Sequence, residues 1–185
     1  MTTYISILRG INLGGHNTIK MDALKELFVR IGLINIQTYI QSGNVVYQCN
    51  DKNSKELNFL ISDEIKRQFG FDVPTITMTF DELSNIVSLN PFVVNETKDL
   101  SLLHVTFLAD KPLSENAAKI GTANYLPDEF HLSEKAVYLY CPNGYGKTKL
   151  SNSFFERKLK VSATTRNWKT TNELLTIACK MESII

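Results

Sequence analysis

The chain has 185 residues, enough for one large domain or two small ones, and 43% hydrophobic and 21% charged residues are typical of a globular protein. No apolar run reaches membrane-spanning length and the N-terminus lacks an export signal, so we expect a cytoplasmic protein with no membrane partner. The three cysteines and three histidines are scattered, which argues against a disulfide framework or a metal site, and no cofactor is expected.

The formal net charge of +1 hides an uneven distribution. Residues 1–50 carry a net charge of +2, residues 51–135 carry −6, and residues 136–185 carry +5. Basic side chains are densest between Lys147 and Lys169. This clustering favours an anionic partner, although a solvated basic face explains it equally well.

The first half of the chain alternates strand and helix patterns. A glycine-rich turn follows the first expected strand and precedes an amphipathic helix. The hairpin signal Ser42-Gly43 joins the next two strands. The expected elements are a strand at 3–8, a helix at 21–31, strands at 35–41 and 44–49, a helix at 54–69, a strand at 75–80 and a short helix at 81–89.

The second half repeats this order. We expect a strand at 102–109, a weak helix at 114–121, strands at 129–133 and 136–141, a helix at 152–159, a strand at 161–166 and a helix at 170–181. A capping box of Thr170 and Glu173 is expected to open the last helix. The repeat predicts an α+β protein of two ferredoxin-like β-α-β-β-α-β-α units that arose by internal duplication, at 1–92 and 101–185.

This topology groups the polar loops. In each unit the first strand-to-helix turn and the central hairpin lie at the same end, so residues 9–20 should lie beside residues 41–44. The polar loops of the second unit lie at its other end. If the units pack as antiparallel pseudo-twofold partners, both rims form one cationic site. The predicted ligand-binding residues are Arg9, Gly10, Asn12, Gly14, Gly15, Lys20, Gln41, Ser42, Asn44, Lys147, Lys149, Arg166 and Asn167.

Each part of this site also has a structural explanation. The glycines would equally serve a tight turn or close packing, and residues 41–44 fit ordinary hairpin chemistry. Arg9 could pair with Asp22 or Glu26. Trp168 is by default a core anchor, and stacking on a base is the minor alternative.

Known nucleotide motifs do not fit. Gly146-Lys147-Thr148 follows a strand and precedes a helix, but Cys141 occupies the first glycine position of a P-loop. The spacing of Gly10, Gly14 and Gly15 does not match the dinucleotide-binding pattern.

The chain resembles a bacterial family known only as a domain of unknown function. The resemblance rests on Leu8–Gly15 with Ile19-Lys20-Met21, on Tyr39–Tyr47, and on the segments Gly144–Ser151 and Ala163–Trp168 near the C-terminus. It implies a duplicated ferredoxin-like arrangement. It implies no activity, cofactor or catalytic residue.

Three functions are consistent with these residues. The preferred one is binding of a phosphate-bearing small molecule, such as a nucleotide, or of a nucleic acid through the glycine turn and basic loops. Alternatively, the same loops form the active site of an enzyme, with His16 as an acid–base group and unknown catalytic residues. The third is a structural or oligomerisation protein. The sequence determines neither the ligand nor the oligomeric state.

Overall fold

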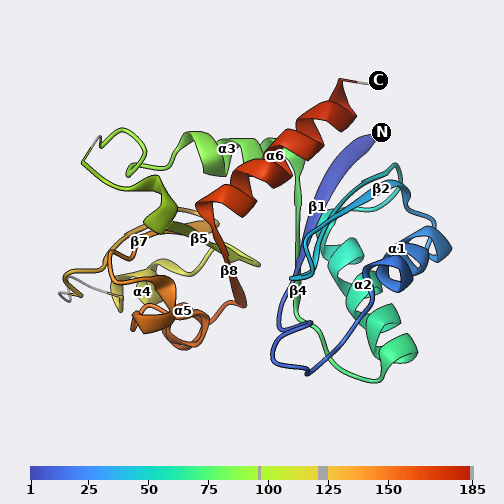
Figure 1. Cartoon of the computed structure of the whole chain (residues 1–185), viewed down its shortest axis with the longest axis horizontal. Helices are drawn as coiled ribbons and strands as arrows, with labels where there is room; N and C mark the ends of the chain where they lie inside the picture. The colour runs from blue at the N-terminus through green and yellow to red at the C-terminus, as the bar shows by residue number, and fades with distance from the viewer. Residues whose placement is uncertain (96, 121–124, 184–185) are drawn as a thin grey trace. The chain divides into compact units, whose positions relative to one another are not determined.

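The computed structural model describes residues 1–95, 97–120 and 125–183. Contacts within the chain divide it into two compact units, one of residues 1–84 and 173–185 and the other of residues 85–172. Each unit holds one four-stranded sheet whose neighbouring strands are all antiparallel, with helices packed beside it (Figure 1). The chain is therefore an α+β protein, as the sequence predicts.

The contact-based units differ from the predicted domains at 1–92 and 101–185. Their boundaries fall within α3 (Phe80–Ser88) and within α6 (Trp168–Glu182), so residues from Glu173 onward group with the first unit. Contact grouping does not measure independent folding, so the predicted domains stay a prediction.

The first unit is built around a sheet of strand order β2-β3-β1-β4. Its elements are β1 (Thr2–Leu8), α1 (Met21–Arg30), β2 (Ile34–Tyr39), β3 (Asn44–Cys49), α2 (Ser54–Phe69) and β4 (Thr75–Thr79). Both helices pack on one face of the sheet (Figure 1). The core between them contains Tyr4, Leu8, Leu24, Leu27, Phe28, Val45, Tyr47, Leu57, Ile61 and Ile65. The apolar positions at helical spacing in the sequence are therefore those that face the sheet.

The second unit has the strand order β6-β7-β5-β8. Its elements are η1 (Leu100–Leu102), β5 (Leu103–Leu108), α4 (Ser114–Ala118), β6 (Glu129–Leu132), β7 (Ala136–Tyr140), η2 (Tyr145–Lys147), α5 (Asn152–Leu159) and β8 (Ala163–Asn167). Its core includes Leu108, Val137, Leu139, Leu150, Phe155, Leu159 and Ala163. Side chains alternate between faces along a strand, so Tyr138 and Tyr140 lie on the face opposite this core.

Two local predictions are wrong. The first hairpin is not a two-residue turn at Ser42-Gly43, because Tyr39 pairs directly with Asn44 and a longer connection lies between them. The last helix begins at Trp168 rather than Thr170, because the Asn167 side chain accepts a hydrogen bond from the Thr170 N–H. Asn167, the last residue of β8, caps the helix as well as the predicted box would.

Candidate functional site

The glycine-rich loop of the first unit connects β1 to α1 and is held by backbone hydrogen bonds. Gly10, Gly14 and Gly15 all have positive φ, and a Cβ atom on any of them would meet no atom within 4 Å. Gly14 and Gly15 form a tight turn that the His16 N–H closes on the Leu13 carbonyl at 3.0 Å. Positive φ at both central positions is typical of a type I′ turn. These glycines therefore serve backbone conformation and not close packing.

Asn12 closes the loop from inside. Its Nδ2 donates to the carbonyls of Ile19 at 3.0 Å and of Gln41 at 2.8 Å, and its Oδ1 accepts from the Ile19 N–H at 2.8 Å. Both amide hydrogens are thus used within the protein. Asn12 fixes the loop against the hairpin of residues 40–43, and its predicted contact with a ligand stays a prediction.

The hairpin meets the glycine-rich loop as the topology predicts. The Leu8 N–H donates to the Gly43 carbonyl at 2.7 Å. A Cβ on Gly43, whose φ is +80°, would lie 2.7 Å from Ile11 Cδ1 and 2.8 Å from Leu8 Cβ. Gly43 is thus the glycine that close packing requires. It was not among the predicted site residues, although the hairpin signal had marked its conformation.

Asn44, Ser42 and Gln41 form the rest of this rim. The buried Asn44 amide donates to the Tyr39 carbonyl and to Ser42 Oγ, both at 3.0 Å. Asn44 therefore shapes the hairpin from within. Gln41 is exposed, and its carbonyl accepts the bond from Asn12.

The N-terminus of α1 lies at the end of the glycine-rich loop and has no side-chain cap. Lys20 occupies the N-cap position, is exposed, and makes no capping hydrogen bond with its side chain. Among helices of eight or more residues in the described part of the chain, the others are capped by Asn53 (α2), Thr79 (α3), Ser151 (α5) and Asn167 (α6). The first N–H groups of α1 are left without such an acceptor, and they carry the positive end of its dipole.

The polar loop of the second unit, residues 142–149, is tied to the sheet. The Tyr145 hydroxyl donates to Thr165 Oγ1 at 3.0 Å, and Thr148 Oγ1 donates to Asp128 Oδ2 at 2.6 Å. Lys147 and Lys149 are exposed on this loop. The following helix, α5, is capped by Ser151, so its first turn does not offer the free amides that α1 does.

Thr165 is the centre of this network. Its Oγ1 lies 2.6 Å from Asn152 Oδ1 and 2.7 Å from Thr106 Oγ1. A carboxamide oxygen only accepts, so Thr165 donates to Asn152, and Thr106 and Tyr145 both donate to Thr165. Thr165, Thr106 and Asn152 were not among the residues predicted from the sequence. Thr106 and Thr165 lie on two different strands and Asn152 on α5, so their contact appears only once these elements are packed together.

Arg166 and Asn167 are not positioned alike. Successive strand residues point to opposite faces, so Arg166 lies on the face opposite Thr165 and the loop at Tyr145. Burial lowers the pKa of the Arg166 guanidinium to about 10, so it keeps its charge at neutral pH. Asn167 caps α6 with its side chain. The second unit therefore does not place Arg166 beside the residues of the 142–149 loop that contact Thr165.

The described residues offer little support for a metal site or an activated thiol. Among them, no group of three or more His, Cys, Asp and Glu side chains could hold a metal ion. Burial raises the pKa of Cys141 to about 11, so this thiol is not an activated nucleophile. His16 is exposed in the glycine-rich loop. No helix in the described ranges is long and apolar enough to cross a bilayer.

A family model matches most of the chain. The family described as "Protein of unknown function (DUF1697)" matches residues 1–138. The chain belongs to this family. The predicted membership in an uncharacterised family is thus confirmed, and the motif at Ala163–Trp168 lies beyond the matched residues.

A solved structure resembles nearly the whole chain. The conserved bacterial protein SP0830 from Streptococcus pneumoniae is 20% identical with a TM-score of 0.73, and the alignment covers 96% of this chain and 98% of that chain. At this identity the likeness shows a shared fold. No curated protein matches the sequence.

Proposed function

We propose that this member of the DUF1697 family binds a phosphate-bearing ligand, a nucleotide or a nucleic acid, at the glycine-rich loop and the N-terminus of α1. The uncapped first turn of α1 carries this proposal. Backbone N–H groups at a helix N-terminus attract anions through hydrogen bonds and the helix dipole, as in phosphate sites of other folds.

The charges around this helix start favour an anion, with one carboxylate nearby. Lys20 at the N-cap and Arg9 at the start of the loop supply positive charge. Asp22 in the first turn opposes it. A phosphate would therefore contact the helix amides and Lys20 while avoiding the Asp22 carboxylate.

The proposal rests on the first unit alone. Lys147, Lys149, Arg166 and Asn167 stay predicted ligand-binding residues of the second unit. The first-unit site does not require them, because its amides and Lys20 come from one loop and one helix.

We also infer that both units are ferredoxin-like and arose by duplication. Each has the order β-α-β-β-α-β, and both sheets have the same order of strands. Ser6 pairs with Thr77 across β1 and β4, and Thr106 pairs with Thr165 across β5 and β8; each hydroxyl pair is hydrogen-bonded. The same hydroxyl pair at the same register supports a common origin.

An amide NMR titration tests the proposed site. Inorganic phosphate, AMP and a short single-stranded RNA are added in turn to the full chain. We expect the largest shifts at the amides of residues 21–23 and at Gly14 and Gly15. Shifts confined to the second unit, or none with any probe, would contradict the site. Binding of RNA that weakens steeply with salt would identify a nucleic-acid ligand, whereas weak salt dependence favours a small molecule.

Two variants sharpen the test. Lys20→Gln should weaken phosphate binding several-fold, and Asp22→Asn should strengthen it, because each changes the charge beside the same amides. Lys55→Gln is the matched control, since Lys55 lies in the first turn of α2, which Asn53 caps. Equal effects of the changes at Lys20 and Lys55 would indicate a general charge effect and no site.

A further inference from the structure

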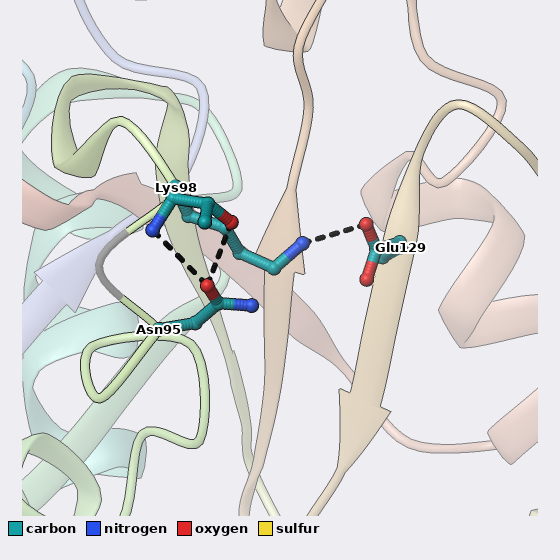
Figure 2. Close-up of polar contacts among 4 residues, drawn as sticks. Asn95, Lys98 and Glu129 are labelled. Atoms are coloured by element: carbon teal, nitrogen blue, oxygen red, sulfur yellow. Dashed lines mark hydrogen bonds and ion pairs between the residues drawn. The ribbon is translucent and has the colours of Figure 1, made fainter.

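Lys98, in the second unit, holds its ammonium group among two rings and a carboxylate. Its Nζ lies 4.1 Å from the ring centroid of Tyr140 and 5.2 Å from that of Phe92. It also donates to Glu129 Oε1 at 2.6 Å, as Figure 2 shows. The Lys98 side chain is 10% exposed, so the ammonium group has left most of its water for these three partners.

Strands β6 and β7 position two of the three groups around the Lys98 ammonium. Glu129 on β6 and Tyr140 on β7 are direct partners in the antiparallel ladder, so they lie on the same face, opposite the core formed by Val137 and Leu139. The Phe92 ring completes the surrounding, with its centroid 6.5 Å from that of Tyr140 and its plane tilted by 44°. The sheet therefore positions two of the three partners whether or not Lys98 is present.

A short turn brings Lys98 to them. The Lys98 N–H donates to the Asn95 carbonyl at 3.0 Å. Asn95 Oδ1 accepts from the Thr97 N–H at 3.1 Å and from Thr97 Oγ1 at 2.7 Å. These bonds hold the Lys98 backbone beside Asn95, from where its side chain reaches the sheet.

The ion pair of Lys66 and Asp72 is more exposed than this one. Its charged atoms lie 2.9 Å apart, and its side chains are 60% and 79% exposed. Such exposed pairs are held weakly in water. At Lys98 the negative faces of two rings add to a carboxylate, and the lysine side chain is 10% exposed while that of Glu129 is 41% exposed. Ring faces around a cation are a means by which proteins recognise alkylammonium groups.

We propose that Phe92, Tyr140 and Glu129 form a binding site for an alkylammonium group, and that Lys98 of the same chain closes it. A group tethered by a short segment acts at an effective concentration of the order of millimolar. A free alkylammonium ion therefore enters only above that range.

A chemical-rescue experiment tests the site. Lys98→Ala removes three methylene groups and the ammonium, and n-propylammonium chloride supplies the same atoms. At a concentration ten times its dissociation constant, the salt should raise the melting temperature of the variant by about 3–5 °C over equimolar NaCl. Wild-type protein, whose site is filled, should show no rise at the same concentration.

Two controls separate the site from general salt effects. n-Propanol has the apolar part without the charge and should not rescue Lys98→Ala. The double variant Lys98→Ala/Glu129→Gln keeps the rings and loses the carboxylate charge, and it should lose most of the rescue. Equal rises with propanol, or in the double variant, would overturn the proposal.

NMR of the wild-type chain keeps the proposal testable if Lys98→Ala does not fold. Ring currents of Tyr140 and Phe92 should shift the Cε protons of Lys98 upfield of those of the exposed Lys147. Tyr140→Leu should remove most of that shift. Matching Cε proton shifts for the two lysines in wild-type protein would show that Lys98 does not occupy the site.

Discussion

At the scale of a single residue, Gly43 packs the hairpin of residues 40–43 against the glycine-rich loop. Its φ of +80° is a conformation that residues with a Cβ adopt rarely, and the space where a Cβ would lie is already filled by Ile11 and Leu8. Gly14 has a similar backbone but open space around it. Replacing Gly14 would therefore cause backbone strain alone, whereas replacing Gly43 would cause both strain and overpacking.

We expect Gly43→Ala to lower the free energy of unfolding by about 2–4 kcal/mol, from strain and overpacking together. Gly14→Ala is the control and should cost about 1 kcal/mol, since only the strain applies. Urea unfolding monitored by circular dichroism measures both. Similar losses in the two variants would mean that Ile11 and Leu8 move aside easily.

His104 gives the second unit a dependence on pH. It stacks on Tyr145 with ring centroids 4.9 Å apart. Burial lowers its pKa below 6.5, and a hydrogen bond to the Leu102 carbonyl offsets part of this. The unfolded chain therefore binds a proton at His104 more readily than the folded chain does, and protonation favours unfolding.

Stability from His104 should be fully present above pH 6.5 and should fall as pH decreases from 6.5 through the lower pKa of the folded state. His104→Phe keeps a ring against Tyr145 and cannot titrate. We expect the wild-type free energy of unfolding to fall more than that of the variant between pH 7.5 and pH 5. Parallel pH profiles would show that His104 does not titrate differently on folding.

At the scale of elements, the presence or absence of a side-chain cap at a helix N-terminus indicates which loop is suited to bind an anion. Four of the longer described helices have an N-terminus capped by the side chain of a preceding residue, and α1 does not. The cap of α6 is the instructive case, because the sequence predicts a box of Thr170 and Glu173 while the structure uses Asn167.

Asn167→Ala should therefore lower the free energy of unfolding by about 1 kcal/mol, the usual cost of losing an N-cap. Glu173→Ala, which removes the exposed partner in the predicted box, should change it by less than about 0.5 kcal/mol. Thermal and urea unfolding of both variants distinguish the two caps. The reverse order of losses would restore the predicted box.

At the scale of the whole molecule, the C-terminal segment has contacts that its place in the sequence does not suggest. The residues from Glu173 onward group with the first unit although they follow the second in the chain. Leu174, Ala178 and Met181 are buried in this segment. Met181 lines a cavity with Ile36 and other first-unit residues.

Removing residues 173–185 should consequently destabilise the first unit. We expect a loss of about 2–5 kcal/mol, comparable to truncating one large buried side chain or more. Hydrogen exchange read by NMR should show faster exchange in β1–β4, with smaller changes in β5–β8. Loss confined to the second unit would instead favour the predicted domain of residues 101–185.

Much of the candidate site in the first unit could be predicted because its residues are close in sequence or are joined by one hairpin. The meeting of residues 9–20 with residues 41–44 follows from strand order alone. The roles within it do not: Asn12 and Asn44 have the same side-chain chemistry as ligand-binding residues, yet their amides are used inside the loops. Only the positions of distant carbonyls distinguish the two uses.

The sequence by itself determined the order of helices and strands, the α+β class and the family, because periodicity and motifs are properties of neighbouring residues. The tertiary structure decided that Gly43 packs on Ile11, that Asn12 donates its amide hydrogen to the Gln41 carbonyl, and that Lys98 reaches Tyr140 and Glu129. Each of these contacts joins segments that are about 30 residues or more apart in the chain, and only packing of the folded unit brings such segments together.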